Sequence, residues 1–269
     1  MIIIISLTSL IYNYFFRLLL CIGLLITSCQ SEKLPSLKIA TASNMQYAMK
    51  ELTDKYTTQS GISCDLIISS SGKLTAQIIE GAPYDVFLSA DLSYPQRVYE
   101  EGLAEGPPAI YAFGDLVLWT MTDIDIKDLS VLKSPAVKRI AIANPKTAPY
   151  GYAALELIES LRVSDQIKQK LVYGESISQV NQFVTTQAAE LGFTAMSVVK
   201  SPQLSEKGQW LKIDSSLYSP LTQGIILINH NDAKTKEAKS FYDFLFSLEA
   251  RKLLKDFGYS VSESDTRHD

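Results

Sequence analysis

A strand that ends in a polar turn and passes directly into a helix recurs four times along this chain. This repeat restricts the possible folds more than any other feature. The turns lie at Ala42–Asn44, Ser69–Leu74, Asn144–Gly151 and Gly174–Ile177. The first N–H groups of a helix lack an acceptor within it, and the positive end of the helix dipole lies behind them. Each turn is therefore a candidate anion site. One such turn is weak evidence, because Ser before a helix is also the commonest N-cap, but four in one chain are stronger evidence.

Apolar runs alternate with segments of helical spacing along most of the chain, which predicts an α/β fold. The pattern restarts after Leu116–Thr120, and two similar units predict two α/β lobes with a ligand cleft between them. In open sheets of this kind ligands bind at the carboxyl ends of the strands, where the polar turns lie. Strands are expected at 37–41, 63–68, 85–89, 116–120, 139–143, 171–173, 191–195 and 225–228, and the last helix at 235–248.

The first 28 residues contain one charge, Arg17, followed by the apolar run Leu18–Ile26. This pattern is typical of a secretory signal peptide, and it is excluded from the fold. The segment Ile26–Cys29 resembles the lipobox of bacterial lipoproteins, in which cleavage precedes the Cys and its thiol carries a diacylglyceryl group. We therefore expect a signal peptide at 1–28, then a lipid-anchor Cys29 and a tether at 29–36, with the protein on a membrane surface in the periplasm or at the cell surface. An ordinary signal peptide or an uncleaved anchor helix is the alternative.

Cysteine content and charge exclude several classes of protein. Beyond the signal and its terminal Cys29, the chain contains Cys64 alone, so it forms no intramolecular disulfide and no Cys-based zinc site. Without Arg17 it carries 24 basic and 29 acidic residues, a net charge of −5. This acidic balance predicts no nucleic-acid partner.

Five segments, in family order and spacing, resemble the molybdate-binding proteins of bacterial molybdate ABC importers: Ala40–Asn44, Ser70–Ile78, Gly81–Asp91, Asn144–Pro145 with Pro149–Gly151, and Leu191–Ser197. The resemblance covers nearly the whole chain after the signal. It implies a type II periplasmic-binding-protein fold, with one lobe at 37–115 plus 223–262 and the other at 116–222. It also implies a monomer that delivers molybdate, and tungstate with it, to an ABC permease. No enzymatic activity and no cofactor are implied.

The resemblance also implies a ligand set of hydroxyl and backbone N–H donors without a cationic side chain or a direct bond to molybdenum. Ser43 and Ser71 would supply hydroxyl and N–H groups, Asn44 a further donor, and Tyr150 and Ile177 their backbone N–H groups. Some family members have a ligand Tyr where this chain has Ala195. This chain is similar to the branch with Asn after the first Ser, in which Asn44 is expected to substitute for that Tyr.

Neutral donors suit this chemistry, because an enclosed oxyanion must regain hydrogen bonds for those it gave to water. With no titrating group in the shell, affinity is expected to be nearly constant around neutral pH. Phosphate carries a proton that needs an acceptor, so a shell of donors rejects it. Sulfate differs from molybdate in size alone, so the radius of the closed cavity must discriminate against it, whereas tungstate should be accepted.

Other interpretations remain open at this point. Ser43 and Ser71 are also typical N-caps, Asn44 a typical turn residue, and Ile177 a typical core residue. Another oxyanion, such as sulfate or phosphate, is the main alternative ligand. A carboxylate would call for an Arg, which the turns lack, and a ferric ion for converging Tyr and carboxylate groups. A Ser-x-x-Lys pattern at Ser70–Lys73 lacks its companion motifs, His230 and His268 lie outside any hydrolase motif, and Lys73 is expected to be solvated.

Overall fold

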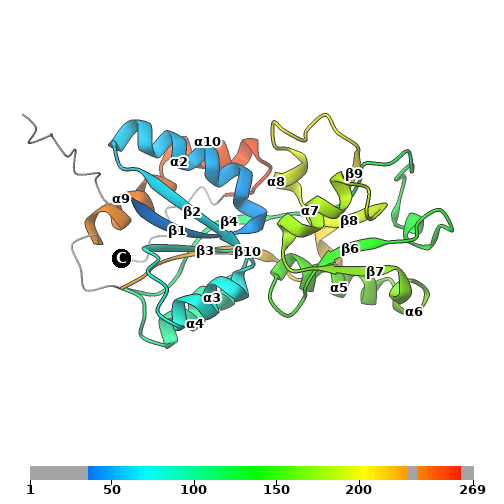
Figure 1. Cartoon of the computed structure of the whole chain (residues 1–269), viewed down its shortest axis with the longest axis horizontal. Helices are drawn as coiled ribbons and strands as arrows, with labels where there is room; N and C mark the ends of the chain where they lie inside the picture. Colours follow the sequence, from blue (N-terminus) through cyan, green and yellow to red (C-terminus); the bar gives the residue numbers. More distant parts are fainter. Residues whose placement is uncertain (1–35, 230–234, 262–269) are drawn as a thin grey trace, which may run out of the picture. The chain divides into compact units, whose positions relative to one another are not determined.

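The computed structural model describes residues 36–229 and 235–261 (Figure 1). The expected signal peptide, Cys29 and the tether up to residue 35 lie outside the described residues, as do His230 and His268. Within the described ranges, no helix combines the length and the apolar character needed to cross a bilayer.

The elements run in the order β1 (Leu37–Ala42), η1 (Ser43–Met45), α2 (Gln46–Ser60), β2 (Cys64–Ser69), α3 (Ser71–Ile79), β3 (Val86–Ser89), α4 (Ser93–Glu100), β4 (Ala109–Gly114), β5 (Leu116–Thr120), η2 (Leu129–Lys133), β6 (Ile140–Ala143), α5 (Pro149–Ser160), α6 (Ser164–Ile167), η3 (Lys168–Lys170), β7 (Leu171–Gly174), α7 (Ile177–Thr185), β8 (Leu191–Ala195), α8 (Met196–Val199), β9 (Gln209–Lys212), η4 (Ser215–Leu217), β10 (Leu221–Leu227), α9 (Thr235–Leu245) and α10 (Leu248–Asp256), where η marks a 3-10 helix.

Two five-stranded sheets organise these elements into two α/β lobes. The first sheet has the order β2-β1-β3-β10-β4 and the second the order β7-β6-β8-β5-β9. In the first, β2, β1 and β3 are parallel and β10 is antiparallel to both its neighbours. In the second, β7, β6 and β8 are parallel and β5 is antiparallel to both its neighbours. The two sheets therefore share one topology. The fourth strand of each, β10 in the first sheet and β5 in the second, is the strand by which the chain enters from the other lobe.

The sheets are mixed, whereas the strand–helix alternation alone predicts parallel ones. The strands β4 and β9 were not predicted, and β10 begins four residues before the expected start at Ile225. Both missed strands lie at sheet edges. The strand β9 is mostly exposed and lacks the continuous apolar run of a buried strand, whereas β4 has such a run at Ala109–Phe113, which the sequence reading overlooked. The predicted helix at 235–248 is two helices, because Ser247 caps the start of α10 with its hydroxyl, which accepts from the Ala250 N–H at 3.2 Å.

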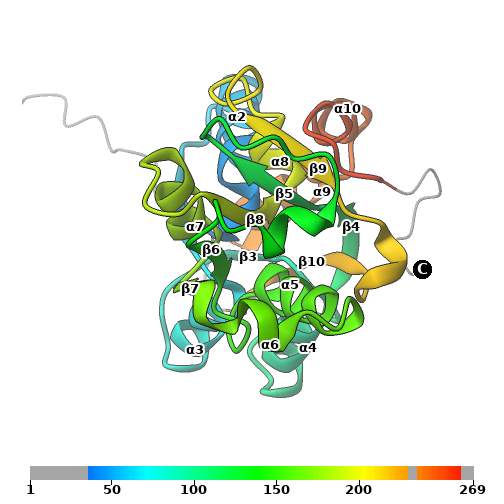
Figure 2. The same ribbon diagram turned by 90° about the vertical axis from the view of Figure 1, so that its right-hand side faces the viewer.

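Helices cover both faces of the first sheet. The helices α2, α9 and α10 bury Leu52, Phe241 and Leu254 against one face, and α3 and α4 bury Leu74 and Val98 against the other (Figure 1). The second sheet has a core of its own, in which α5 and α7 pack on β6 and β8 (Figure 2). The chain leaves the first sheet at Gly114 and returns after β9. These packed layers hold the carboxyl ends of the parallel strands, and the turns that follow them, in fixed positions.

Candidate functional site

A small cavity lies where the two lobes meet, and all five residues that the family resemblance implies as ligands line it. The centre of a water-sized sphere can occupy about 10 Å³ of it, which is about the room that one buried water molecule needs. Its lining consists of Ala42, Ser43, Asn44, Ser70, Ser71, Ala90, Ala148, Pro149, Tyr150 and Ile177. The structure therefore brings residues as far apart in the sequence as Ser43 and Ile177 together around one small space.

Four helical N-termini converge on this cavity: those of η1, α3, α5 and α7. Each follows a parallel strand or its turn, so the carboxyl ends of β1, β2, β6 and β7 face the same space. Within residues 36–229 and 235–261, the backbone N–H groups of Asn44, Ser71, Tyr150 and Ile177 donate to no other group. Unpaired N–H groups at helix starts attract negative charge, and here four of them border one cavity.

Close packing places the Tyr150 N–H at the cavity. A Cβ at Gly151 would lie 2.1 Å from the carbonyl oxygen of Ala143, so a side chain there would push the start of α5 away from β6. Pro149 occupies the first turn of α5, where its missing N–H leaves no donor unsatisfied. The Tyr150 ring extends from the cavity toward Gly114, at the end of β4. Its hydroxyl is buried without a partner among the described residues, and burial raises its pKa well above the usual value.

The two predicted hydroxyl groups differ in their contacts. The Oγ of Ser71 accepts the Ala90 N–H at 3.0 Å, which leaves its own proton free for a ligand oxygen. The hydroxyl of Ser43 forms no hydrogen bond with any described residue, and the side chain is 3% exposed. Neither hydroxyl caps its own helix. The capping interpretation of these two serines is therefore wrong, and both hydroxyls remain available as donors.

The amide of Asn44 is already occupied. Gln223 directs its Nε2 to the carbonyl oxygens of Ala90 and Leu221, at 3.1 and 3.2 Å, so its Oε1 must face the other way. That Oε1 accepts from Asn44 Nδ2 at 2.8 Å, and the Tyr259 hydroxyl accepts from the same nitrogen at 3.0 Å. Both amide hydrogens of Asn44 are thus used, and its donor toward the cavity is the backbone N–H. The Oδ1 of Asn44 is buried without a partner among the described residues.

The segment that carries Ala195 in place of a Tyr still contacts the site. Ser197, two residues further on, donates its hydroxyl to the Asn44 carbonyl oxygen at 2.7 Å. It thereby joins the second lobe to η1, and Tyr259 packs beside it with its hydroxyl 3.0 Å from Ser197 Oγ. Sequence reasoning missed Ser70 in the cavity wall and Ser197, Gln223 and Tyr259 behind it. Ser197 ends the family-like segment Leu191–Ser197, whereas no motif marks Gln223 or Tyr259, which approach Asn44 only through the fold.

The lobes touch around the rim of the cavity. Three contacts join α3 and α4 to the turns of the second lobe: Gly72 N–H to Thr147 O at 2.9 Å, the Tyr94 hydroxyl to Lys146 O at 3.1 Å, and an ion pair between Lys73 and Glu175. Lys73 was expected to be solvated. It is instead paired, although both side chains of the pair remain largely exposed. Its ammonium group therefore lies at the rim of the cavity, where it pairs with Glu175 and not with Ser70.

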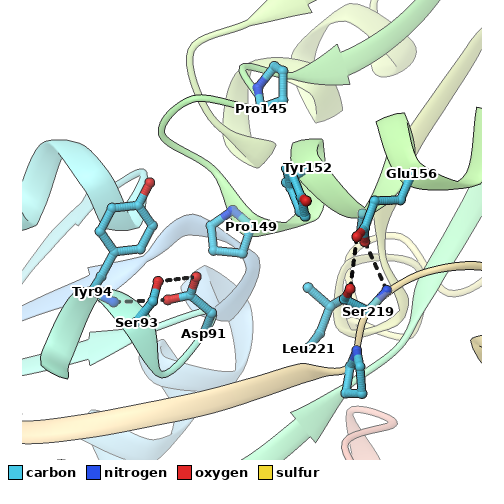
Figure 3. A pocket seen from close by; sticks show the side chains of 11 residues that line it. Asp91, Ser93, Tyr94, Pro145, Pro149, Tyr152, Glu156, Ser219 and Leu221 are labelled. Carbon is cyan, nitrogen blue, oxygen red and sulfur yellow. Dashed lines mark hydrogen bonds between the residues drawn. The ribbon is translucent and has the colours of Figure 1, made fainter. Parts of the chain in front are cut away.

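A wider groove runs along the outside of the same junction, with about 730 Å³ of open space (Figure 3). Its carboxylates are bound by their own chain. Asp91 accepts from the Ser93 hydroxyl and the Tyr94 N–H, and Glu156 accepts from the N–H and hydroxyl of Ser219. These bonds hold the turns that flank the cavity and leave the groove without a free charged group for a ligand.

No charged side chain lines the small cavity. Among the residues that the structure describes, no cluster of His, Cys, Asp or Glu has the arrangement of a metal site. Cys64 is half-buried at the start of β2, and burial raises the pKa of its thiol to about 11, so the thiol stays protonated at neutral pH. The chemistry available at the site is therefore donation of neutral hydrogen bonds.

Residues 37–260 match the family of bacterial extracellular solute-binding proteins. This chain belongs to that family. The solute-binding protein is 37% identical over 221 residues to the molybdate-binding protein ModA of Rhodobacter capsulatus, covering 82% of this chain and 86% of ModA. It is 34% identical over 248 residues to ModA of Azotobacter vinelandii, covering 91% and 97%.

The fold agrees with these similarities. The solved structure of the Azotobacter vinelandii periplasmic molybdate-binding protein superposes with a TM-score of 0.81 at 29% identity, covering 85% of this chain and 100% of that one. The predicted family resemblance and the predicted type II periplasmic-binding-protein fold are confirmed. Membership of a solute-binding family implies a binding role for the solute-binding protein.

Proposed function

We propose that this protein binds molybdate, and tungstate with it, in the ten-residue cavity and delivers the anion to an ABC permease without a catalytic step. The observation that carries the proposal is the convergence of four helical N-termini with unpaired N–H groups on a buried cavity that no charged side chain lines. Similarity to two ModA proteins at 34% and 37% identity supports the choice of ion.

The donors divide into two kinds. Ser43 and Ser71 would donate their hydroxyl protons as well as their N–H groups, while Asn44, Tyr150 and Ile177 would donate backbone N–H groups. Hydrogen bonds to a charged partner contribute about 1.5 to 3 kcal/mol each, so five or more can replace the hydration that an enclosed dianion loses. The helix dipoles add favourable potential at the same point. A bound ion would thus be held by polarity alone, with no counter-charge and no cofactor.

Selectivity follows from the donors and from size. A shell of donors disfavours a protonated oxyanion such as phosphate, and the walls set by two contacting lobes disfavour the smaller sulfate. The buried hydroxyls of Ser70 and Tyr150, unpartnered among the described residues, can donate as well as accept, whereas Asn44 Oδ1, which is also buried and unpartnered there, can only accept. Measurable phosphate binding would point to this oxygen as the acceptor of the phosphate proton.

The proposal extends to the rest of the chain. We infer a monomer with lobes at 37–115 plus 223–262 and at 116–222, whose closed form docks on the permease. A lipid on Cys29 would hold the mature protein at a membrane surface outside the cytoplasm. The lipobox-like segment Ile26–Cys29 supports this anchor. Mass spectrometry of the protein from membranes should find a diacylglyceryl group on Cys29, and its absence there would refute the anchor.

Calorimetric titration of the purified protein with molybdate, tungstate, sulfate and phosphate tests the proposed ligand. We expect tight one-to-one binding of the first two anions and weak binding of the others. Equal or tighter binding of sulfate would assign the site to the alternative oxyanion class. If none of the four anions binds detectably, the proposed oxyanion site at this cavity is refuted.

A further inference from the structure

Ser70 occupies the N-cap position of α3 but does not act as a cap. An N-cap serine normally accepts the N–H of the second or third helical residue through its hydroxyl oxygen. Ser70 has the extended backbone that this requires, with φ −73° and ψ 150°, yet its side chain forms no capping bond. The helix α3 is nine residues long, so a capping hydrogen bond would stabilise its first turn as it does in other helices.

A second serine in the same chain shows that backbone geometry does not prevent the cap. Ser247 precedes α10 with φ −66° and ψ 157°, close to the values at Ser70, and its hydroxyl accepts the Ala250 N–H. The two serines therefore share residue type, position and backbone, and differ in where the hydroxyl points. The backbone at Ser70 would therefore allow a capping hydrogen bond, but the hydroxyl does not form one.

The hydroxyl of Ser70 is instead buried at the wall of the cavity. The side chain is 2% exposed, the residue lines the cavity, and Oγ has no hydrogen-bond partner among the described residues. Its carbonyl oxygen is used within the helix, where it accepts the Leu74 N–H at 3.1 Å. A buried hydroxyl without a partner is costly, and a ligand oxygen in the cavity would remove that cost.

We propose that Ser70 is a further ligand residue, whose hydroxyl donates to an oxygen of the bound oxyanion beside that of Ser71. The inference rests on the proposed function, because it needs an oxyanion in this cavity. It adds a hydroxyl to the expected donors. Adjacent serines on one turn then supply two hydroxyl donors, one oriented by the Ala90 N–H and one without a partner in residues 36–229 and 235–261.

The test is Ser70→Ala, with molybdate affinity measured by calorimetry and thermal unfolding measured without ligand. We expect affinity to fall by about 10-fold to 100-fold, the range for losing a hydrogen bond to a charged group. The unfolding temperature without ligand should be unchanged or higher, since the removed hydroxyl forms no hydrogen bond within the part of the chain that the structure describes.

Two control variants separate ligand binding from other roles. Thr41→Val removes another buried hydroxyl without a partner, outside the cavity lining, and should leave affinity unchanged. Ser247→Ala removes a working cap, and should lower the unfolding temperature but not affinity.

Unchanged affinity of Ser70→Ala beside a wild-type protein that binds molybdate would overturn this inference alone. A drop in its unfolding temperature like that of Ser247→Ala would also overturn it, by showing that the hydroxyl caps α3 in solution. No binding by the wild-type protein would overturn the proposed function together with the inference.

Discussion

Gly72 lies where α3 of the first lobe meets the turn before α5 of the second, and its replacement by Ala tests whether that contact contributes to binding. A Cβ at this position would lie 2.9 Å from Tyr94 Oη and 3.0 Å from the Cα of Thr147. The Tyr94 hydroxyl can swing away, but Thr147 is backbone and must move with its turn. The methyl group therefore opposes the approach of the lobes.

The size of the effect follows from two terms. Overpacking a close contact costs about 1 to 3 kcal/mol, and the Gly72 N–H···O bond to Thr147, now 2.9 Å, contributes about 0.5 to 1.5 kcal/mol. The turn can relax by a few tenths of an ångström, so we expect a net loss of about 1 to 2 kcal/mol in binding, or about 5-fold to 30-fold in affinity. Without ligand, the free energy of unfolding should be unchanged or higher by about 0.4 to 1 kcal/mol, because Ala leaves the unfolded chain less conformational freedom than Gly.

The assay combines calorimetry for molybdate affinity with denaturant unfolding of the unliganded protein. Gly106→Ala is the matched control, because a Cβ there meets nothing within 4 Å, and it should change neither the affinity nor the cavity. If Gly72→Ala folds normally and binds molybdate as tightly as wild type, the contact between Gly72 and Thr147 does not form part of the ligand-bound state. The predicted contribution of this contact to binding is then refuted.

Three further results are expected. Ser43→Ala and Ser71→Ala should each weaken molybdate binding by about 1.5 to 3 kcal/mol in calorimetry, and wild-type affinity in both variants would show that the ion binds elsewhere. Affinity should be constant between about pH 6 and pH 9, because no side chain that titrates in that range lines the cavity; a clear slope in calorimetric affinity across that range would contradict the neutral shell. Stability should fall above about pH 10, because burial raises the pKa of Tyr111, Tyr150 and Tyr259 in the native state. The unfolded chain then ionises first and native stability is lost as pH rises, which unfolding curves up to about pH 11 would check.

The local signature of strand-to-helix turns predicted the four segments that carry the site, while the individual ligand residues came from the family resemblance. Ser43, Asn44, Ser71, Tyr150 and Ile177 each stand within one or two residues of a helix start, and the structure gathers all five around one cavity. The parallel-sheet rule, which sends the carboxyl ends of strands to one edge, accounts for that gathering.

The rest depended on tertiary contacts that no local pattern records. Asn44 reaches Gln223 and Tyr259 across 179 and 215 residues, and only that contact shows that its amide is occupied. Ser70 and Ser247 have nearly the same backbone, so the difference in their hydroxyls could not be read from sequence. The edge strand β9 was missed because a strand with one free edge and mostly exposed side chains needs no apolar run.

The unpaired N–H groups are divided evenly between the lobes, with Asn44 and Ser71 on the first and Tyr150 and Ile177 on the second. Separating the lobes would leave either half with two of the four. At about 1.5 to 3 kcal/mol for each lost bond, the retained half would hold the ion about a hundred to ten thousand times more weakly. Unloading would then be a mechanical event that needs no proton, competing ion or chemical change in the cargo. A membrane partner would only have to hold the two halves apart.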